Sequence, residues 1–369
     1  MNAATIDFET RSAFDLRRGG SWGYAEHEST EIMCLAVRMP DGFEFLWHPE
    51  YPSVGIEETG WEELGQFFEY VIRGGLIEAH NAQFERAIWT YVGTKRLGWP
   101  VVKGNQWRCS AAVAATHAIP RSLAGAADAL GLDQIKDDKG ARIMKRISKP
   151  RLPVKADLSY IALKLWDDAS RWKEVGKPKD MWVLKQLYGH LPGVESMNPW
   201  HENLDDLRML FDYCQQDVRT EHALSVRLGD LAGDELSLWQ LDQNMNARGV
   251  QIDLPLVDKA IELADICGDE SNARLHTLTD GAVRTCNQRD AFLNWINGRG
   301  GPKLKDTQKA TIEKAVKNPK WDEKAREALQ IRLDQAKSSV KKYPAMKMVT
   351  NSDGRARGLL AYHGADTGR

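Results

Sequence analysis

Strand-type patterns are confined to the first third of this chain, and helical patterns dominate the rest. Ala4, Ile6 and Phe8 alternate with polar residues, which is the period of two that a half-buried strand shows. Three further apolar runs predict strands at 32–37, 43–47 and 76–79. From 106 to 230 the pattern is mainly helical, with an apolar stripe along 204–228. This order predicts an α/β domain in which helices flank a sheet.

Beyond Gly233 the pattern contains helices only, so we place a domain boundary between residues 232 and 233. A length of 369 residues also suggests two domains, at roughly 150 residues each. Helices are predicted at 256–278, 288–297, 306–316 and 322–343. Pro344 is expected to kink or end the last of these helices.

The composition excludes several classes of protein. Hydrophobic residues make up 42% and charged residues 28%, which is ordinary for a globular chain. No run of about 18 apolar residues predicts a transmembrane helix, and the first residues do not resemble a signal peptide. Five widely spaced cysteines without a C-x-x-C pair argue against a disulfide framework and a zinc ribbon. We therefore expect a cytoplasmic protein.

Charge is distributed unevenly along the chain. Residues 281–369 contain 19 basic and 9 acidic residues, a net charge of +10, whereas residues 1–280 carry −12. A basic segment beside an acidic one suggests a polyanionic partner for the basic part. A solvated helical surface rich in lysine explains the same pattern equally well.

Two acidic motifs lie on predicted regular elements near the N-terminus. Asp7 and Glu9 are two residues apart on a strand, so both carboxylates point to the same face. Asn81 and Glu85 are four residues apart at the start of a helix and share one face of it. The simpler interpretations are the solvent face of an edge strand and a helix cap at Asn81.

A third motif, Tyr213 and Asp217, lies on the long predicted helix, again with a spacing of four. Alone, this pair is more typical of a helix surface than of a site. Carboxylates that converge on one point repel each other unless a cation neutralises them. Hard oxygen ligands select Mg²⁺ or Mn²⁺ rather than zinc, and a pair of such ions can promote phosphodiester hydrolysis.

Taken together, the three motifs resemble those of the DEDDy 3′–5′ exonucleases. They read Asp-Phe-Glu-Thr at 7–10, Asn-Ala-Gln-Phe-Glu at 81–85 and Tyr-Cys-Gln-Gln-Asp at 213–217. More specifically, they resemble the proofreading domain of phage-type family A DNA polymerases, as does the stretch 120–132. The resemblance implies a ribonuclease-H-like mixed sheet flanked by helices.

The resemblance continues through the second half of the chain. Residues 239–253 resemble the entry to the polymerase region, 338–342 the thumb helix that holds duplex DNA, and 353–369 the approach to the palm. The implied domains are an exonuclease domain over 1–232 and a thumb-like helical DNA-binding region over 233–369. The palm and fingers motifs do not occur before Arg369, so we expect no polymerase activity from this chain alone and poor packing after Asn351.

The family resemblance also implies a role for each acidic residue. Asp7 bridges two Mg²⁺ or Mn²⁺ ions, Glu9 and Asp217 complete the ion that holds the attacking water, and Tyr213 orients that water. Glu85 stands where many members have Asp. Because Glu is one methylene longer, it either reaches its ion through a different rotamer or acts through water. The implied activity is metal-dependent 3′–5′ exonuclease proofreading during DNA replication.

The implied substrate-binding residues lie in both halves of the chain. Thr10 contacts the terminal nucleotide, and Asn81 steadies that nucleotide or the helix of Glu85. Lys337, Lys341 and Lys342 would contact duplex phosphates from the end of a long helix. The expected partners are a single-stranded 3′ end, duplex DNA and, in a split enzyme, a separate palm-fingers chain; no membrane partner is expected.

Two alternative functions remain open at this stage. One is a non-catalytic DNA-binding or assembly subunit of a split polymerase, against which the complete carboxylate set argues. The other is an RNA-trimming exonuclease of the same superfamily, against which the thumb-like region argues.

Overall fold

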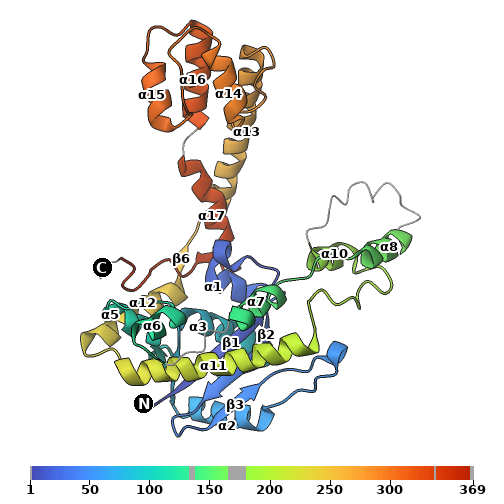
Figure 1. Cartoon of the computed structure of the whole chain (residues 1–369), viewed down its shortest axis with the longest axis vertical. Helices are drawn as coiled ribbons and strands as arrows, with labels where there is room; N and C mark the ends of the chain where they lie inside the picture. Colours follow the sequence, from blue (N-terminus) through green and yellow to red (C-terminus); the bar gives the residue numbers. More distant parts are fainter. Residues whose placement is uncertain (1, 133–137, 165–179, 336–337, 366–369) are drawn as a thin grey trace. The chain divides into compact units, whose positions relative to one another are not determined.

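The computed structural model describes residues 2–132, 138–164, 180–335 and 338–365 (Figure 1). The chain forms two compact units: unit 1 comprises Met1–Val250 with Arg355–Arg369, and unit 2 comprises Gln251–Gly354. None of the helices in the described ranges combines the length and the apolar character that crossing a membrane requires.

Unit 1 contains a mixed five-stranded sheet in the order β3-β2-β1-β4-β5. The strands are β1 (Ala3–Arg11), β2 (Glu31–Arg38), β3 (Glu44–Trp47), β4 (Leu76–Ala79) and β5 (Trp107–Cys109). The central strand β1 runs antiparallel to β2 and parallel to β4, β3 is antiparallel to β2, and β5 is parallel to β4. The predicted α/β class, with a mixed sheet flanked by helices, is confirmed.

Helices account for most of the rest of unit 1. They are α1 (Leu16–Glu26), α2 (Trp61–Ile72), α3 (Gln83–Ile88), α4 (Lys95–Leu97), α5 (Ser110–Thr116), α6 (Leu123–Ala129), α7 (Asp138–Ile147), α8 (Lys155–Lys164), α10 (Met181–Tyr188), α11 (Leu204–Leu228) and α12 (Asp234–Arg248). Single 3₁₀ turns occur at Pro52–Val54 and Gly104–Gln106, and a π-helical turn occurs at Trp89–Thr94.

The alternation along β1 gives the sheet two different faces. Ile6 and Phe8 belong to a core that includes several buried tryptophans. Cys34 and Ala36 of β2 face the other way and pack with Leu207 and neighbouring apolar residues of α11. Helix α11 therefore covers the face that carries the polar residues of β1, and Figure 1 shows it lying across the sheet. A fully buried leucine contributes about 1.5–3 kcal/mol to this packing.

Helix α11 has the bounds that its sequence predicts, because local signals define both ends. The Asn203 side chain accepts hydrogen bonds from the backbone N–H groups of Asp205 and Asp206 and caps the N-terminus. The carboxylates of Asp205 and Asp206 also oppose the positive end of the helix dipole. Gly229, with a φ of 78°, ends the helix in a conformation that favours glycine.

The division into compact units differs from the predicted boundary at 232/233. Helix α12 packs on unit 1, because its Trp239 is buried in the main core of that unit. The chain passes from unit 1 to unit 2 at β6 (Val250–Gln251), which pairs with β7 (Arg355–Ala356) where the chain returns. Unit 2 is thus an insertion in unit 1, which hydrophobic periodicity alone does not predict.

The segment after Asn351 is held on unit 1 by several hydrogen bonds, contrary to expectation, although Leu359 and Leu360 are exposed. The buried Asn246 side chain bonds the backbone N–H and C=O of Leu360 at 2.8 and 3.0 Å. The Arg121 guanidinium donates to the Tyr362 carbonyl oxygen at 2.6 Å. Tyr362 also packs against the main core and donates to Glu235. The prediction was wrong because unit 1 itself supplies the packing partner.

Unit 2 is helical, with a core of its own. Its helices are α13 (Leu254–Leu278), α14 (Arg289–Asn297), α15 (Lys309–Val316), α16 (Glu323–Gln335) and α17 (Lys342–Met348), with a 3₁₀ turn at Ser338–Lys341. The core is centred on Leu275, Phe292, Trp321 and Leu329. The predicted helix 322–343 is therefore not continuous. Pro344 lies in the first turn of α17, where its missing N–H breaks no helical hydrogen bond.

Candidate active site

The first acidic motif lies on the face of β1 that α11 covers. Asp7 is half-buried and Glu9 is 8% exposed. The Cys214 thiol of α11 lies 3.4 Å from the backbone oxygen of Asp7, so the helix contacts the strand at this residue. The pairing with β2 shifts register directly after Glu9, at Thr10. This bulge interrupts the regular ladder beside the acidic residues.

The second motif places Glu85 inside the protein. Glu85 is 4% exposed on α3, and its Oε2 atom has no hydrogen-bond partner among the residues that the structure describes. Asn81 precedes this helix with a φ of 70°, a left-handed conformation that Asn tolerates. The N-cap position belongs to Ala82, which makes no side-chain cap bond. The simpler interpretation of Asn81 as the helix cap is therefore wrong, and Asn81 is exposed beside Glu85.

The third motif lies on α11. The Tyr213 and Asp217 side chains are hydrogen-bonded to each other across one helical turn, and both are half-buried. Because the tyrosine hydroxyl donates to a carboxylate, this bond holds the phenol proton in place. Burial first, and then the charges of Asp217 and Glu9, raise the pKa of Tyr213 far above its ordinary value.

The carboxylates of the three motifs lie close enough for their charges to affect the pKa values of Glu9 and Glu85. Burial raises the pKa of Asp7 to about 6. Burial and then the negative charge of Asp7 raise the pKa of Glu85, and the same causes raise the pKa of Glu9. Asp217 and Glu85 add to the shift of Glu9. The charges of carboxylates on β1, α3 and α11 therefore affect the pKa values within this group, as is expected of carboxylates that bind a common cation.

The donor set fits a hard divalent cation in its chemistry. It consists of carboxylate oxygens, and Glu85 Oε2 is both buried and unpartnered. Across the described ranges, no three His, Cys, Asp or Glu side chains already form a group arranged to hold a metal ion. Binding would therefore require side-chain rotations that bring the carboxylates closer together.

The predicted substrate-binding residues have different surroundings. Thr10 is buried and its hydroxyl lies 3.0 Å from the Tyr24 hydroxyl, so it is engaged inside the protein. Lys341 and Lys342 are exposed in unit 2, at the junction of the 3₁₀ turn and α17. Lys337 lies outside the described residues.

The charge of unit 2 is smaller than the charge of the sequence segment 281–369. Residues 251–354 contain 18 basic and 15 acidic residues, a net charge of +3. Helix α13 alone contributes five of the acidic side chains. Lys347 is paired with Asp258 of α13 at 2.7 Å. The positive charge of this unit is therefore local rather than general.

Sequence reasoning missed a second group of buried polar residues on the same face of the sheet. Glu78 of β4 and Glu221 of α11 are each 1% exposed, and burial raises the pKa of both. Ser110 at the start of α5 connects Glu221 to His80. Two signals were available: a carboxylate inside a predicted buried strand, and a second one four residues beyond Asp217.

The full sequence was also compared with known proteins. No protein-family model matches the chain. Over 378 aligned residues the chain is 29% identical to the DNA polymerase of Bacillus phage SP02, covering all of this chain and 50% of that protein. This chain is similar to a phage DNA polymerase. The predicted resemblance to a phage DNA polymerase is therefore confirmed, and the chain spans half the length of the curated relative that it matches.

A solved structure was also found, with a weak likeness. It is the POL domain of Pol1 from M. smegmatis in complex with DNA primer-template and dNTP. The TM-score is 0.46 and the sequence identity 10%, over all of this chain and 50% of that one.

Proposed function

We propose that this chain is the 3′–5′ exonuclease portion of a DNA polymerase and removes 3′-terminal nucleotides from DNA in proofreading. The observation that supports the proposal is that Asp7, Glu85 and Asp217 all raise the pKa of the buried Glu9, while Asp7 also raises that of the buried Glu85. These residues are as far as 210 positions apart in the sequence. Their mutual effect on pKa is a property expected of a built site rather than of scattered surface charges.

The same four carboxylates are the residues that would hold two Mg²⁺ or Mn²⁺ ions. Such ions, when bound, supply an activated water and stabilise negative charge on the phosphate oxygens. The protein's part is to keep the carboxylates on rigid elements, and the packing of α11 on β1 does so. The raised pKa values of Asp7, Glu9 and Glu85 mean that ionising these carboxyls is costly in the buried site. A bound cation would relieve that cost.

Tyr213 would orient the attacking water. Its pKa is raised far above neutrality by burial and by the Asp217 and Glu9 charges, so the hydroxyl stays protonated. While that proton is donated to Asp217, the phenol oxygen can still accept a hydrogen bond from water. The tyrosine therefore positions the water without removing its proton.

The substrate proposed is a single-stranded or frayed DNA 3′ end. Asp7 is only half-buried and Asn81 is exposed beside Glu85, so a strand end could reach the carboxylates from this side. A terminal base has to leave the duplex stack before its phosphodiester reaches a recessed site. Frayed ends meet this requirement at lower cost than paired ends.

The test uses a 5′-labelled oligodeoxynucleotide with Mg²⁺ or Mn²⁺. Release of mononucleotides from its 3′ end is measured as shortening of the labelled strand. We expect Asp7→Ala and EDTA each to abolish release, while Glu69→Ala, which removes an exposed carboxylate of α2, leaves the rate unchanged. The melting temperature of each variant shows whether the fold is intact. A rate that survives EDTA or Asp7→Ala would overturn the metal-site assignment.

The same assay separates the alternative functions. A wild-type protein that binds the oligodeoxynucleotide but releases nothing with either metal would indicate a non-catalytic DNA-binding subunit. Faster trimming of an oligoribonucleotide of the same sequence would indicate an RNA exonuclease.

A further inference from the structure

A chain of hydrogen bonds that begins in the interior connects α11 with the segment that precedes α3. Glu221 Oε1 of α11 lies 2.9 Å from Ser110 Oγ, and Ser110 Oγ lies 2.8 Å from His80 Nδ1. On the other side of the ring, His80 Nε2 lies 2.7 Å from the backbone oxygen of Arg121. Glu221 and Ser110 are each 1% exposed, so water does not compete for the bond between them, whereas His80 is half-buried.

The two ends of this chain lie next to the proposed catalytic motifs. Glu221 is one helical turn beyond Asp217 on α11. His80 directly precedes Asn81, and Glu85 follows in the next helix, α3. No backbone ladder joins α11 to the 80–85 segment, since α11 lies on the sheet rather than within it. Side-chain bonds are therefore well placed to fix the distance between these elements.

We propose that Glu221, Ser110 and His80 form a brace that sets the position of the 81–85 segment relative to α11, and that they act as positioning residues for the exonuclease site. The expected effect of the brace on catalysis rests on the exonuclease function proposed above. The brace itself is a structural statement that can be tested without any activity.

The protons of the brace can be assigned by counting donors. The Arg121 carbonyl only accepts, so His80 Nε2 carries a proton and donates it. In a neutral imidazole, Nδ1 then accepts, and the single Ser110 proton is donated to it. Glu221 must in turn donate to Ser110 Oγ, which requires a protonated carboxyl. The alternative arrangement, with Ser110 donating to an ionised Glu221, requires His80 to carry both ring protons and a positive charge.

Burial favours the uncharged arrangement. Removal from water raises the pKa of Glu221 well above its ordinary value, and the charges of Glu78 and Glu85 raise it further. Burial also lowers the pKa of His80 to about 4, despite the bond to the Arg121 carbonyl. Both shifts retain the proton on Glu221 and keep the ring neutral. The pattern is not that of a hydrolytic triad, because the carboxyl meets the serine rather than the imidazole.

The first experiment is a long-range ¹H–¹⁵N spectrum of the histidine rings in the full chain at pH 7. We expect His80 to show the Nε2–H tautomer, with an unprotonated Nδ1. In Ser110→Ala the Nδ1 resonance should move toward that of a nitrogen without a hydrogen bond. Ser29→Ala is the matched control, because Ser29 is another buried serine that contacts a histidine, His27, at 2.7 Å. An Nδ1 resonance that does not change in Ser110→Ala would overturn the brace, and a doubly protonated His80 would overturn the neutral arrangement of its protons.

The second experiment compares two substitutions of Glu221 on the single-stranded substrate. Glu221→Gln keeps a neutral donor for Ser110, so kcat should stay within about threefold of wild type. Glu221→Leu removes the donor, and kcat should fall at least about tenfold with KM little changed, because small displacements of catalytic groups are costly. The kcat of Ser110→Ala should fall by a similar factor. This second variant keeps the test decisive where Glu221→Leu does not fold.

The outcomes separate this proposal from the proposed function. Equal losses in Glu221→Gln and Glu221→Leu would show that the charge matters and would overturn positioning. Wild-type kcat in both Glu221→Leu and Ser110→Ala would overturn it as well. A wild-type protein without nuclease activity contradicts the proposed function, while the histidine spectrum still decides whether the brace exists.

Discussion

At the scale of single residues, Glu85 is the group whose identity departs from the pattern of the exonucleases that the three motifs resemble. It is buried, carries an unpartnered oxygen and lies near the charge of Asp7. We predict that Glu85→Gln lowers the rate of nucleotide release at least about 100-fold, since a carboxylate acting on developing phosphate charge is worth about 3 kcal/mol. Single-turnover assays of the metal-loaded protein measure this loss in rate.

Tyr213→Phe provides the comparison for Glu85→Gln. It removes one hydroxyl and no charge, so its loss in rate should be smaller. A Glu85→Gln protein within twofold of wild type would mean that Glu85 has no part in the reaction.

The raised pKa of Asp7 predicts how stability depends on pH. A carboxyl whose pKa is about 6 in the folded protein and 3.8 when unfolded binds more protons in the folded state between these values. Stability without divalent ions should therefore be highest at acidic pH and fall as the pH rises from about 4 through 6. Glu9 and Glu85 shift in the same direction and extend this decline.

Melting curves in EDTA at pH 5 and pH 7 check this prediction. We expect a lower melting temperature at pH 7, and recovery when Mg²⁺ or Mn²⁺ is added, because an ion that binds only the folded state stabilises it. Asp7→Asn should reduce both effects. A melting temperature that rises steadily from pH 4 to pH 7 in EDTA would contradict the shift.

At the scale of elements, the basic residues of unit 2 lie on short pieces rather than on one long helix. Lys341 and Lys342 are exposed where the 3₁₀ turn meets α17. If each contacts a phosphate, the double variant Lys341→Ala with Lys342→Ala should weaken duplex DNA binding. It should also reduce the slope of log K against log salt by about 2.

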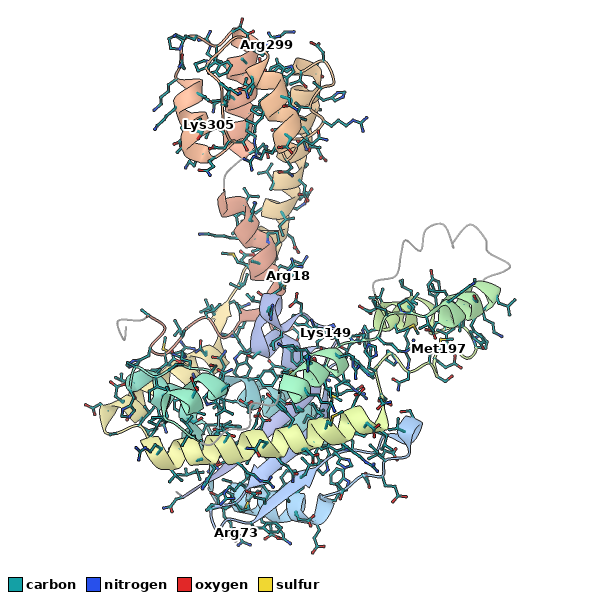
Figure 2. All side chains as sticks on the ribbon, viewed as in Figure 1. Arg18, Arg73, Lys149, Met197, Arg299 and Lys305 are labelled. Carbon is teal, nitrogen blue, oxygen red and sulfur yellow. The ribbon has the colours of Figure 1, made fainter. Side chains whose placement is uncertain are left out.

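Fluorescence anisotropy with a labelled duplex, at several salt concentrations, measures that slope. Lys303→Ala with Lys305→Ala is the matched control, because it removes the same charge from exposed positions elsewhere in unit 2 (Figure 2). Equal slopes for wild type and the Lys341 and Lys342 variant would reduce this stretch to a solvated surface.

At the scale of the whole molecule, unit 2 is inserted between two paired strands of the chain. Ile252 N–H donates to the Gly354 oxygen at 2.9 Å, so the points where the insertion begins and ends are adjacent. Replacing residues 253–353 by a short glycine linker should therefore leave unit 1 folded. We predict that this variant keeps single-strand nuclease activity and loses duplex affinity.

Circular dichroism melting and the two DNA assays check this outcome, with the full chain as the reference. A deletion variant that does not fold would show that unit 1 depends on the insertion. Unchanged duplex affinity would place the duplex-binding surface in unit 1.

The sequence predicted the elements that depend on near neighbours. The bounds of α11 follow from a capping Asn203 and a terminal Gly229, and the common face of Asp7 and Glu9 follows from the period of a strand. These features are local, since a few adjacent residues define them. The roles assigned to the acidic residues came from resemblance and stay predictions.

Only the tertiary structure decided what depends on residues far apart in the chain. It placed α12 and residues 355–365 on unit 1, buried Glu85, and joined Glu221 to His80 through Ser110. Such contacts join residues separated by as many as 242 positions, as between Arg121 and His363. Periodicity reports which face of an element is apolar, but not which other element covers that face, because that choice is made by the packing of the whole domain.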